Sequence, residues 1–393
     1  MIGDRIRARR KQLGLTQEQL AAGRFDRSYI SRIEANEVIP PLETLRVLAE
    51  RLAKPVSYFL GDPDEFTREK VIHDYLRRAA RHARRRRYRQ AVQDYQVALD
   101  LLNRADDSPR LLSVHIDLAH AYACLNQLDA GARHLFTAFS LLSRVPLDRC
   151  PPDTLYRLHY TRGRLAYARD EQEVAAEAFR LAAAAATRAV DRVRAQVALA
   201  GTLFRTGRYP EALELYAGGL SGGASRAAAG SPAPRLPLGL VAACHHGAGA
   251  CYCALGRLDL AAYHLERALQ LYRGRDPERL LLASHDLGIV LARKGAWNLA
   301  RRRLRECLRG YLQRGHGEAV ASVLVDLAGL ELAAGRHRRA LTLARIAKGR
   351  AKQARRPRLY LSAVEKEAQA LAALDPAAAR ALNGVVRDLR ALG

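Results

Sequence analysis

The chain has 393 residues, enough for two or three domains, with 49% hydrophobic residues and a formal net charge of +25. It contains no uncharged apolar run of about 18 residues, and its first residues lack the apolar core of a signal peptide. We therefore expect a cytoplasmic protein without membrane contact. Six cysteines in such a chain do not predict a disulfide framework.

The positive charge is unevenly distributed along the chain. Residues 1–66 carry 11 Lys or Arg against 10 Asp or Glu, with 8 against 4 in residues 1–36 and 3 against 6 in residues 37–66. The excess lies in residues 67–393. Total charge is therefore weak evidence for a nucleic-acid partner. Such a partner has to be inferred from local sequence motifs instead.

Residues 12–36, QLGLTQEQLAAGRFDRSYISRIEAN, have the layout of a helix-turn-helix. Thr16 can cap a short helix, and Gln19 stands three positions later to complete a capping box. Gly23 allows the chain to turn, and Asp26 can cap a second helix. The pattern predicts two short helices joined by a tight turn.

The second of these helices is expected to turn Ile30 and Ile33 inward and to expose a polar side. Further helices predicted at 2–12 and 43–53, with a closing segment at 56–61, would complete a five-helix domain over residues 1–66. The outward polar residues of a recognition helix read base edges in the major groove. Here those residues are Arg27, Ser28, Ser31 and Arg32.

Residues 1–61 resemble the Cro/repressor-type (XRE) helix-turn-helix domain. The resemblance implies that Gln17, Arg27, Ser28 and Arg32 face double-stranded DNA and that Arg10 and Asn36 lie near phosphates. The turn is one residue shorter than in the commonest form of that domain. Pro41 stands where a Ser or Thr usually caps the fourth helix.

From residue 67 onward a pattern of about forty residues recurs, which predicts tetratricopeptide-like helix pairs. Each copy places small residues where paired helices cross and large residues between neighbouring copies. Seven copies are followed by two helices, at about 358–373 and 376–391, that should cap the array. The expected fold class is all-α, with an α-solenoid over residues 67–393. The clearest copies are Leu118-Ala119-Tyr122 with Leu128-Gly131-Leu135-Ala138, and Gly249-Tyr252 with Leu258-Ala261-Leu265-Ala268.

Residues 218–237, GGLSGGASRAAAGSPAPRLP, interrupt the array. This Gly, Ser, Ala and Pro composition predicts a flexible loop between the fourth and fifth copies. A phosphate-binding loop is excluded because no Gly-Lys-Ser/Thr follows the glycines.

The first helices of tetratricopeptide arrays line a concave surface. The residues expected to face this groove are cationic and aromatic, which suits an extended peptide with an acidic side chain or a free carboxylate. The alternative is that Arg is abundant throughout and some must face inward. The assigned groove residues are Arg157, Tyr160, Arg164, Tyr167, Arg194, Phe204, Arg205, His246, His285 and Arg293.

The combination of this helix-turn-helix with a long-helix array resembles the RRNPP-type regulators (the Rgg, NprR, PlcR and PrgX group) over essentially the whole chain. The resemblance implies a homodimeric quorum-sensing transcription regulator. Its array would bind a short, reimported peptide that alters the spacing of two DNA-reading heads. That family often uses Asn on groove helices, whereas the assigned positions here carry Arg, Tyr and His.

Two alternatives to this function remain open. The array could instead dock another protein, such as a response regulator or sporulation factor. The chain could also be an anti-activator with a vestigial DNA head. We find no nucleophile elbow, zincin, Walker or dinucleotide motif, so we expect neither an enzyme nor a cofactor.

Two further patterns have a functional and a structural interpretation. Cys244-His245-His246 with Cys251 and Cys253 could hold zinc, but their spread around one helix favours packing, so no metal is expected. Residues 67–90 carry 10 basic and 2 acidic residues, including four consecutive arginines at 84–87. This run could contact phosphates flanking the DNA site or form a solvated turn.

Overall fold

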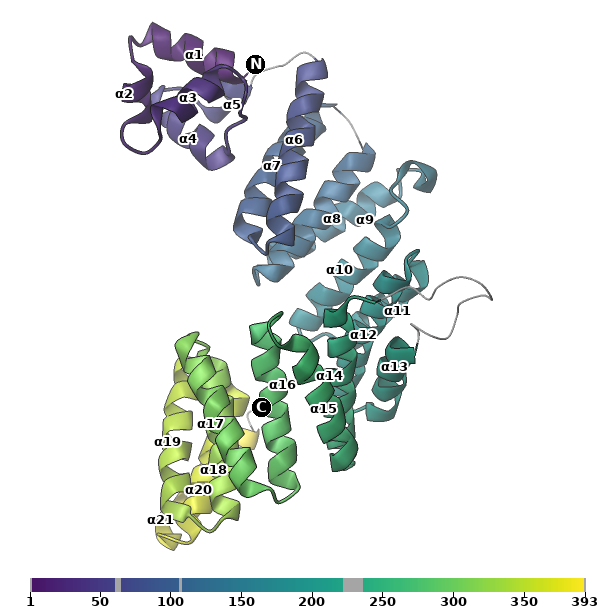
Figure 1. The fold of residues 1–393 in the computed structure, drawn as a ribbon, viewed down its shortest axis with the longest axis vertical. Helices are drawn as coiled ribbons and strands as arrows, with labels where there is room; N and C mark the ends of the chain where they lie inside the picture. The colour runs from purple at the N-terminus through teal and green to yellow at the C-terminus, as the bar shows by residue number, and fades with distance from the viewer. Residues whose placement is uncertain (1, 61–64, 106–107, 222–235, 392–393) are drawn as a thin grey trace. The chain divides into compact units, whose positions relative to one another are not determined.

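The computed structural model describes residues 2–60, 65–105, 108–221 and 236–391, and every regular element in them is a helix (Figure 1). The all-α fold class expected from the sequence is confirmed. The N-terminal head, residues 2–60, consists of five short helices. They are α1 (Ile2–Gln12), α2 (Gln17–Ala21), α3 (Arg27–Glu34), α4 (Leu42–Arg51) and α5 (Val56–Leu60).

The head encloses a small apolar core to which all five helices contribute. Helical spacing places one apolar stripe of each helix inside, and the largest of these side chains are fully buried. The expected burial of Ile30 and Ile33 of α3 is confirmed. Completely buried members are Ile6, Leu20, Ile30, Ile33, Leu45, Leu48, Leu52 and Phe59.

The array consists of seven helix pairs followed by two more helices, as the forty-residue pattern predicted. The pairs are α6 (Glu65–Arg84) with α7 (Tyr88–Ala105), α8 (Ser108–Cys124) with α9 (Leu128–Leu142), α10 (Thr154–Ala168) with α11 (Gln172–Ala185), α12 (Ala189–Arg205) with α13 (Tyr209–Ser221), α14 (Leu238–Ala254) with α15 (Leu258–Tyr272), α16 (Pro277–Arg293) with α17 (Trp297–Gln313), and α18 (Gly317–Ala333) with α19 (His337–Gln353). The last helices are α20 (Pro357–Ala372) and α21 (Pro376–Ala391), and a short 3₁₀ turn, η1 (Leu147–Arg149), precedes α10.

The turn inside each pair contains one residue with a positive φ. This left-handed residue ends the first helix and reverses the chain toward the second. The first three copies use Arg, Asn and Asp, whereas the last four use glycine, which adopts this conformation without steric cost. The residues are Arg86, Asn126, Asp170, Gly207, Gly256, Gly295 and Gly335.

The chain forms two compact units, Met1–Thr187 and Arg188–Gly393, and the expected boundary between head and array at 66/67 falls within the first unit. In this unit the core of the head continues without a break into α6, α7 and α8. Tyr75 of α6, fully buried, belongs to this shared core. The head and the first repeats therefore form one packed body.

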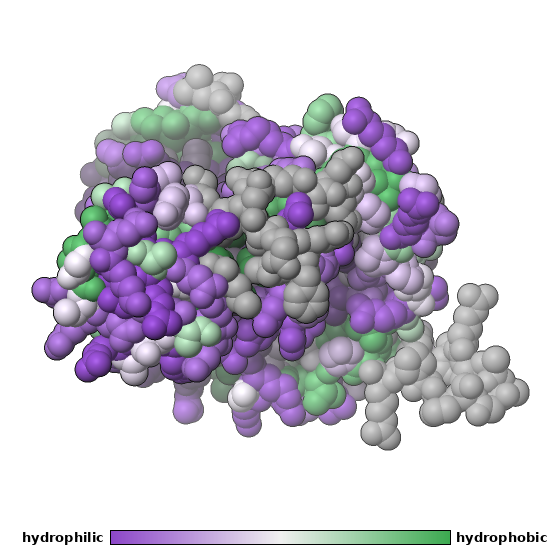
Figure 2. Space-filling view, turned by 90° about the horizontal axis from the view of Figure 1, so that it is seen from above, coloured by the Kyte–Doolittle hydropathy of each residue, from purple (hydrophilic) through white to green (hydrophobic). Residues whose placement is uncertain are grey.

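The interruption expected at residues 218–237 is shorter in the structure. Helix α13 continues to Ser221, so residues 218–221 are helical, and α14 begins at Leu238. Residues 222–235 lie outside the described part of the chain. None of the described helices is long and apolar enough to cross a membrane. Hydrophilic side chains dominate the face seen in Figure 2.

Candidate DNA-binding face and ligand groove

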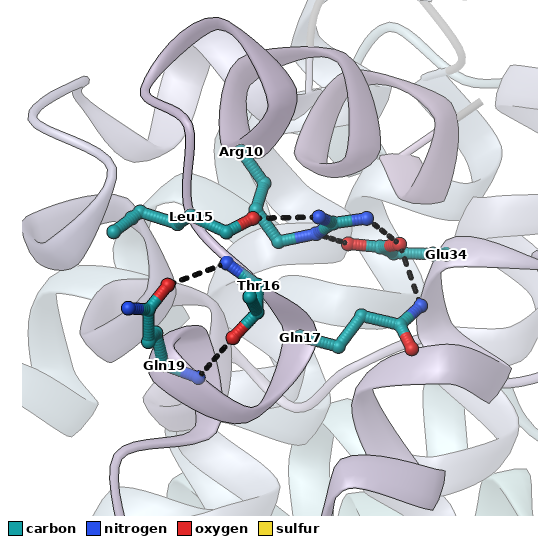
Figure 3. Close-up of polar contacts among 6 residues, drawn as sticks. All are labelled: Arg10, Leu15, Thr16, Gln17, Gln19 and Glu34. Atoms are coloured by element: carbon teal, nitrogen blue, oxygen red, sulfur yellow. Dashed lines mark hydrogen bonds and ion pairs between the residues drawn. The ribbon is translucent and has the colours of Figure 1, made fainter.

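The start of α2 is held by the capping box expected from the sequence (Figure 3). Thr16 Oγ1 accepts a hydrogen bond from the Gln19 amide at 3.1 Å, and Gln19 Oε1 accepts one from the Thr16 amide at 2.7 Å. Ala22 and Gly23 then reverse the chain with φ values of 38° and 69°. Asp26 precedes α3, but its side chain makes no capping hydrogen bond.

Helix α3 exposes the polar residues that were expected to read DNA. Because Ile30 and Ile33 are buried, Arg27, Ser28 and Ser31 lie on the opposite, exposed side. Arg32 is exposed as well, and its Nε lies 3.6 Å from Glu37 Oε2, a loose contact between two side chains that are each about 60% exposed. Such a pair restrains Arg32 only weakly. These four side chains are brought together and face solvent.

Two other expected DNA contacts, Arg10 and Gln17, form hydrogen bonds inside the head (Figure 3). Arg10 donates to both carboxylate oxygens of Glu34, at 2.6 and 2.8 Å, and to the Leu15 carbonyl at 2.7 Å. Gln17 Nε2 donates to the same carboxylate at 2.9 Å. Arg10 is 11% exposed and Glu34 is 3% exposed. The cluster joins α1, α2 and α3. Contact of Arg10 with a phosphate stays a prediction.

The charge on Glu34 is stabilised by this cluster. Burial alone would raise the pKa of its carboxyl group. Hydrogen bonds from Arg10 and Gln17, together with the Arg10 charge, outweigh burial and hold the pKa below its ordinary value. The Arg10–Glu34 pair therefore ties α1 to the last residue of α3.

Asn36, also expected near a phosphate, ties the end of α3 to the start of α1. Its Oδ1 accepts a hydrogen bond from the Gly3 amide at 2.9 Å, and its Nδ2 donates to Asp4 Oδ1 at 3.1 Å. Its φ of 59° places the residue in the left-handed region. Sequence reasoning missed one further contact of this kind. Arg51 of α4 donates to the carbonyls of Leu20 and Ala21, at 2.6 and 2.7 Å, and so caps the end of α2.

Tyr75 and Arg78 of α6 attach the head to the first repeat. Tyr75 Oη donates to the Pro40 carbonyl at 2.9 Å, and Arg78 Nη1 donates to the Ile39 carbonyl at 3.0 Å. Arg78 also bonds both oxygens of the buried Asp94, each at 2.9 Å. Burial raises the pKa of Tyr75 to about 12. The sequence signal for this junction was only the spacing of Tyr75 and Arg78 on one helix face.

In the first unit, the two assigned groove arginines contact residues of the preceding repeat. Arg157 of α10 donates to Asp117 of α8 at 2.5 Å, and Arg164 lies 3.4 Å from His120 Nε2 and 3.2 Å from Cys124 Sγ. Burial, together with the charges of Arg164 and Arg157, lowers the pKa of His120 to about 4. The spacing of 40 residues between partners is the repeat length itself.

The two tyrosines assigned to the groove of the first unit are half-buried. The Tyr160 ring stacks 5.5 Å from that of Tyr156 and lies 5.6 Å from that of Phe179, whereas Tyr167 is the second-last residue of α10. The predicted face therefore exists, but its side chains already have partners within the protein.

The same arrangement recurs in the second unit. His246 Nε2 lies 2.7 Å from Asp286 Oδ2, and His285 Nε2 lies 2.7 Å from Asp326 Oδ2. Each contact joins the first helix of one repeat to that of the next. Arg293 follows the rule as well, because it donates to Cys253 Sγ at 3.2 Å across 40 residues.

The remaining groove residues of the second unit belong to α12. Arg194 pairs with Asp191 of the same helix at 2.5 Å. The Phe204 ring lies 5.3 Å from that of Tyr209, and Arg205 is exposed at the end of the helix.

A pocket of about 720 Å³ opens in the second unit beside His285. Both apolar and charged groups line it, and no other predicted groove residue does. No sequence pattern predicts this pocket, because it forms where the turn between α17 and α18 meets two neighbouring helices. Its lining includes Glu278, Arg279, Leu282, Tyr311, Ser322 and Leu359.

The cysteine and histidine pattern on α14 is built into helix packing. Cys244 and Cys251 are fully buried, and burial raises the pKa of their thiols to about 12 and about 11. His245 faces His264 of α15, with the two Nδ1 atoms 3.0 Å apart. Within the described residues, no group of three or more His, Cys, Asp or Glu side chains gathers as a metal site would require.

Comparison with known families identifies both parts of the chain. Residues 6–59 match the helix-turn-helix family, and residues 240–313 match the tetratricopeptide repeat family. No curated protein matches the sequence. The chain thus joins an XRE-type helix-turn-helix domain to tetratricopeptide repeats.

Two solved structures share this fold across nearly the whole chain. The apo form of the quorum sensor NprR from B. thuringiensis has a TM-score of 0.59 at 14% identity, covering 97% of this chain and 99% of its own. A Rap protein complexed with Competence and Sporulation Factor has a TM-score of 0.53 at 12% identity, covering 95% and 98%. The expected resemblance to RRNPP-type regulators is confirmed at the level of the fold.

Proposed function

We propose that this helix-turn-helix and tetratricopeptide-repeat protein is a sequence-specific DNA-binding transcription regulator. The observation that carries the proposal is the exposed polar face of α3, formed by Arg27, Ser28, Ser31 and Arg32. These side chains sit on a helix whose opposite side is locked into the head core. Guanidinium groups presented in this way suit bidentate contacts with guanine in the major groove.

The test is to replace Arg27 and Arg32 with Ala, singly and together, in the full chain. The probe is the duplex that the wild-type protein selects from a random-sequence pool. Each substitution should weaken binding by about 1–3 kcal/mol, roughly five- to 150-fold, and relax selection at one base position. Arg338→Ala, an exposed arginine of α19, serves as the control. Unchanged affinity in both α3 variants would favour the anti-activator with a vestigial head.

We further propose that the array binds a short signalling peptide that modulates DNA binding. The similarity in fold to the quorum sensor NprR and to a Rap protein complexed with Competence and Sporulation Factor supports this proposal. Because Arg157, His246 and His285 are engaged between repeats, the pocket beside His285 is the proposed anchoring point in the second unit. Its mixed lining can hold an apolar side chain next to a polar backbone.

This proposal can be tested with synthetic peptides. Their sequences would come from short open reading frames beside the gene that encode small exported peptides. A cognate peptide should change DNA affinity about five- to 150-fold, the usual range of coupling free energies. Leu282→Glu, at an exposed pocket position, should remove this response and leave basal DNA affinity intact. Leu299→Glu, exposed on α17 outside the pocket lining, is the matched control. A response that survives Leu282→Glu would exclude this pocket.

A second candidate function, docking of another protein, is favoured by exposed apolar side chains on second helices. Phe136 of α9 is 75% exposed, and Tyr263 of α15 and Leu299 of α17 are more than half exposed. Exposed apolar groups of this kind are common at protein interfaces. If Phe136→Ser abolishes regulation in cells whereas no peptide alters DNA affinity in vitro, docking replaces the peptide proposal.

We also propose that the protein acts as a homodimer, because one helix-turn-helix offers little surface and two-fold sites are the usual solution. Sedimentation of the full chain with and without the selected duplex tests this point. A single chain bound to a site with no internal symmetry would contradict it.

A further inference from the structure

The turn between α6 and α7 gathers exposed arginines that the proposed recognition helix does not include. Arg81 and Arg84 end α6, Arg85 and Arg87 flank the left-handed Arg86, and Arg89 starts α7. We call Arg81, Arg84, Arg85, Arg87 and Arg89 the α6–α7 basic cluster. All five side chains are exposed, and none forms an ion pair with a carboxylate in the described part of the chain.

Two other arginines of the first repeats are paired with carboxylates, unlike those of the cluster. Arg78, three residues before Arg81, is bonded to buried Asp94, and Arg110 of α8 pairs with Glu69 at 2.5 Å. In the cluster itself, positive charge accumulates without compensation. The positive potential of the cluster also affects His82. Burial lowers the pKa of His82, the charges of Arg78, Arg87 and Arg81 lower it further, and the charge of Asp94 acts in the opposite direction.

The cluster is held at a fixed distance from the head. Arg78 bonds the Ile39 carbonyl and Tyr75 bonds the Pro40 carbonyl, so α6 is attached to the segment that links α3 to α4. From Arg78 to Arg85 the helix advances about 10 Å, at about 1.5 Å per residue. This is well below the length of one duplex turn, about 34 Å. The long arginine side chains of the cluster extend beyond the helix and add to the distance that the cluster can span.

We propose that the α6–α7 basic cluster binds the phosphate backbone of the duplex beside the base pairs read by α3. This inference rests on the proposed DNA-binding function and extends the contact surface from the head into the first repeat. Phosphate contacts of this kind carry no sequence information but add affinity and fix orientation. They would couple the array to DNA, since α6 and α7 belong to the packed core of the first unit.

The test variant is Arg84→Gln/Arg85→Gln/Arg87→Gln in the full chain. Arg86 is left in place because its φ of 58° belongs to the turn. The probe is a random-sequence duplex, titrated with salt. Each lost phosphate contact should reduce the slope of log affinity against log salt concentration by about 0.9. The triple variant should lose one to three contacts, so its slope should be smaller by about 0.9 to 2.7. Binding at low salt should fall about ten- to hundredfold.

The matched control is Arg338→Gln/Arg339→Gln/Arg350→Gln, which removes the same charge from three exposed arginines of α19. If both triple variants lose affinity equally, net charge rather than a local contact is responsible and the inference fails. An unaltered salt slope in the α6–α7 variant also overturns it. Arg27→Ala separates the two proposals, because it should relax base selection with little change in slope. If the wild-type protein does not bind duplex DNA, both proposals fall.

Discussion

The recognition helix and the first helices of the array carry similar polar residues but use them differently. In the head, a buried Arg10–Glu34 pair holds the helices together. Arg27 and Arg32 of α3 are not part of this pair and are exposed to solvent. In the array, Arg157 and His246 on the predicted groove face are themselves the partners of neighbouring repeats. Helical periodicity thus predicts which residues share a helix face in both regions. Only in the head are most of the side chains on that face without strong partners inside the protein.

The comparison depends first on the internal pair of the head. Glu34→Ala should leave Arg10 buried and unpaired, and should cost about 3–5 kcal/mol of head stability. Amide hydrogen exchange in the full chain measures this directly as lost protection in α1, α2 and α3. Glu37→Ala, at an exposed position close to Arg32, should change protection little. Similar protection in both variants would mean that the pair does not hold the head together.

Much of the fold was predictable because it depends on repetition and on backbone chemistry. The capping box of Thr16, the buried Ile30 and Ile33 and the seven helix pairs all follow from spacing. The engagement of Arg10 with Glu34 was not predictable, because nothing in the local sequence brings residues 24 apart into contact. Likewise, the pocket beside His285 depends on how a turn meets two helices.

The second test asks whether packing or polar contacts hold the array. An added Cβ at Gly247 of α14 would lie 2.1 Å from the Tyr216 ring of α13. Gly247→Ala should therefore destabilise the second unit by about 1–3 kcal/mol through overpacking. Gly218→Ala, with nothing within 4 Å, should stabilise α13 by up to about 1 kcal/mol. Thermal unfolding followed by circular dichroism compares them, and equal effects would contradict close packing at this crossing.

The third test uses pH to separate the two regions, because residues 1–60 contain no histidine. In the array, His115 and His134 face each other with Nδ1 atoms 3.0 Å apart, as do His245 and His264. Burial, with a contribution from His134, lowers the pKa of His115 to about 4, and burial lowers the pKa of the other three from 6.5. The folded array therefore binds fewer protons than the unfolded chain between these values.

Stability from these pairs should be complete above pH 6.5 and should decline as the pH falls toward 4. Because the pairs are only half-buried, we expect a loss of about 1–2 kcal/mol, or a few degrees in Tm. Exchange in α8, α9, α14 and α15 should accelerate over this range while α1–α4 stay protected. Simultaneous loss of protection in α3 would show that the head and array do not respond separately.

The smallest expected effect concerns how α2 presents α3. Thr16→Ala removes the side-chain bond to the Gln19 amide and should cost about 1 kcal/mol. Asp26→Ala is the matched variant, because Asp26 holds the corresponding position before α3 without a capping bond. It should cost less, although each residue immediately precedes a helix of the same helix-turn-helix. Since α3 is held by Ile30 and Ile33, DNA affinity should change at most a few-fold in either variant. A larger loss of affinity in Asp26→Ala than in Thr16→Ala would mean that Asp26 caps α3 when DNA is bound, and that the recognition helix is completed by its target.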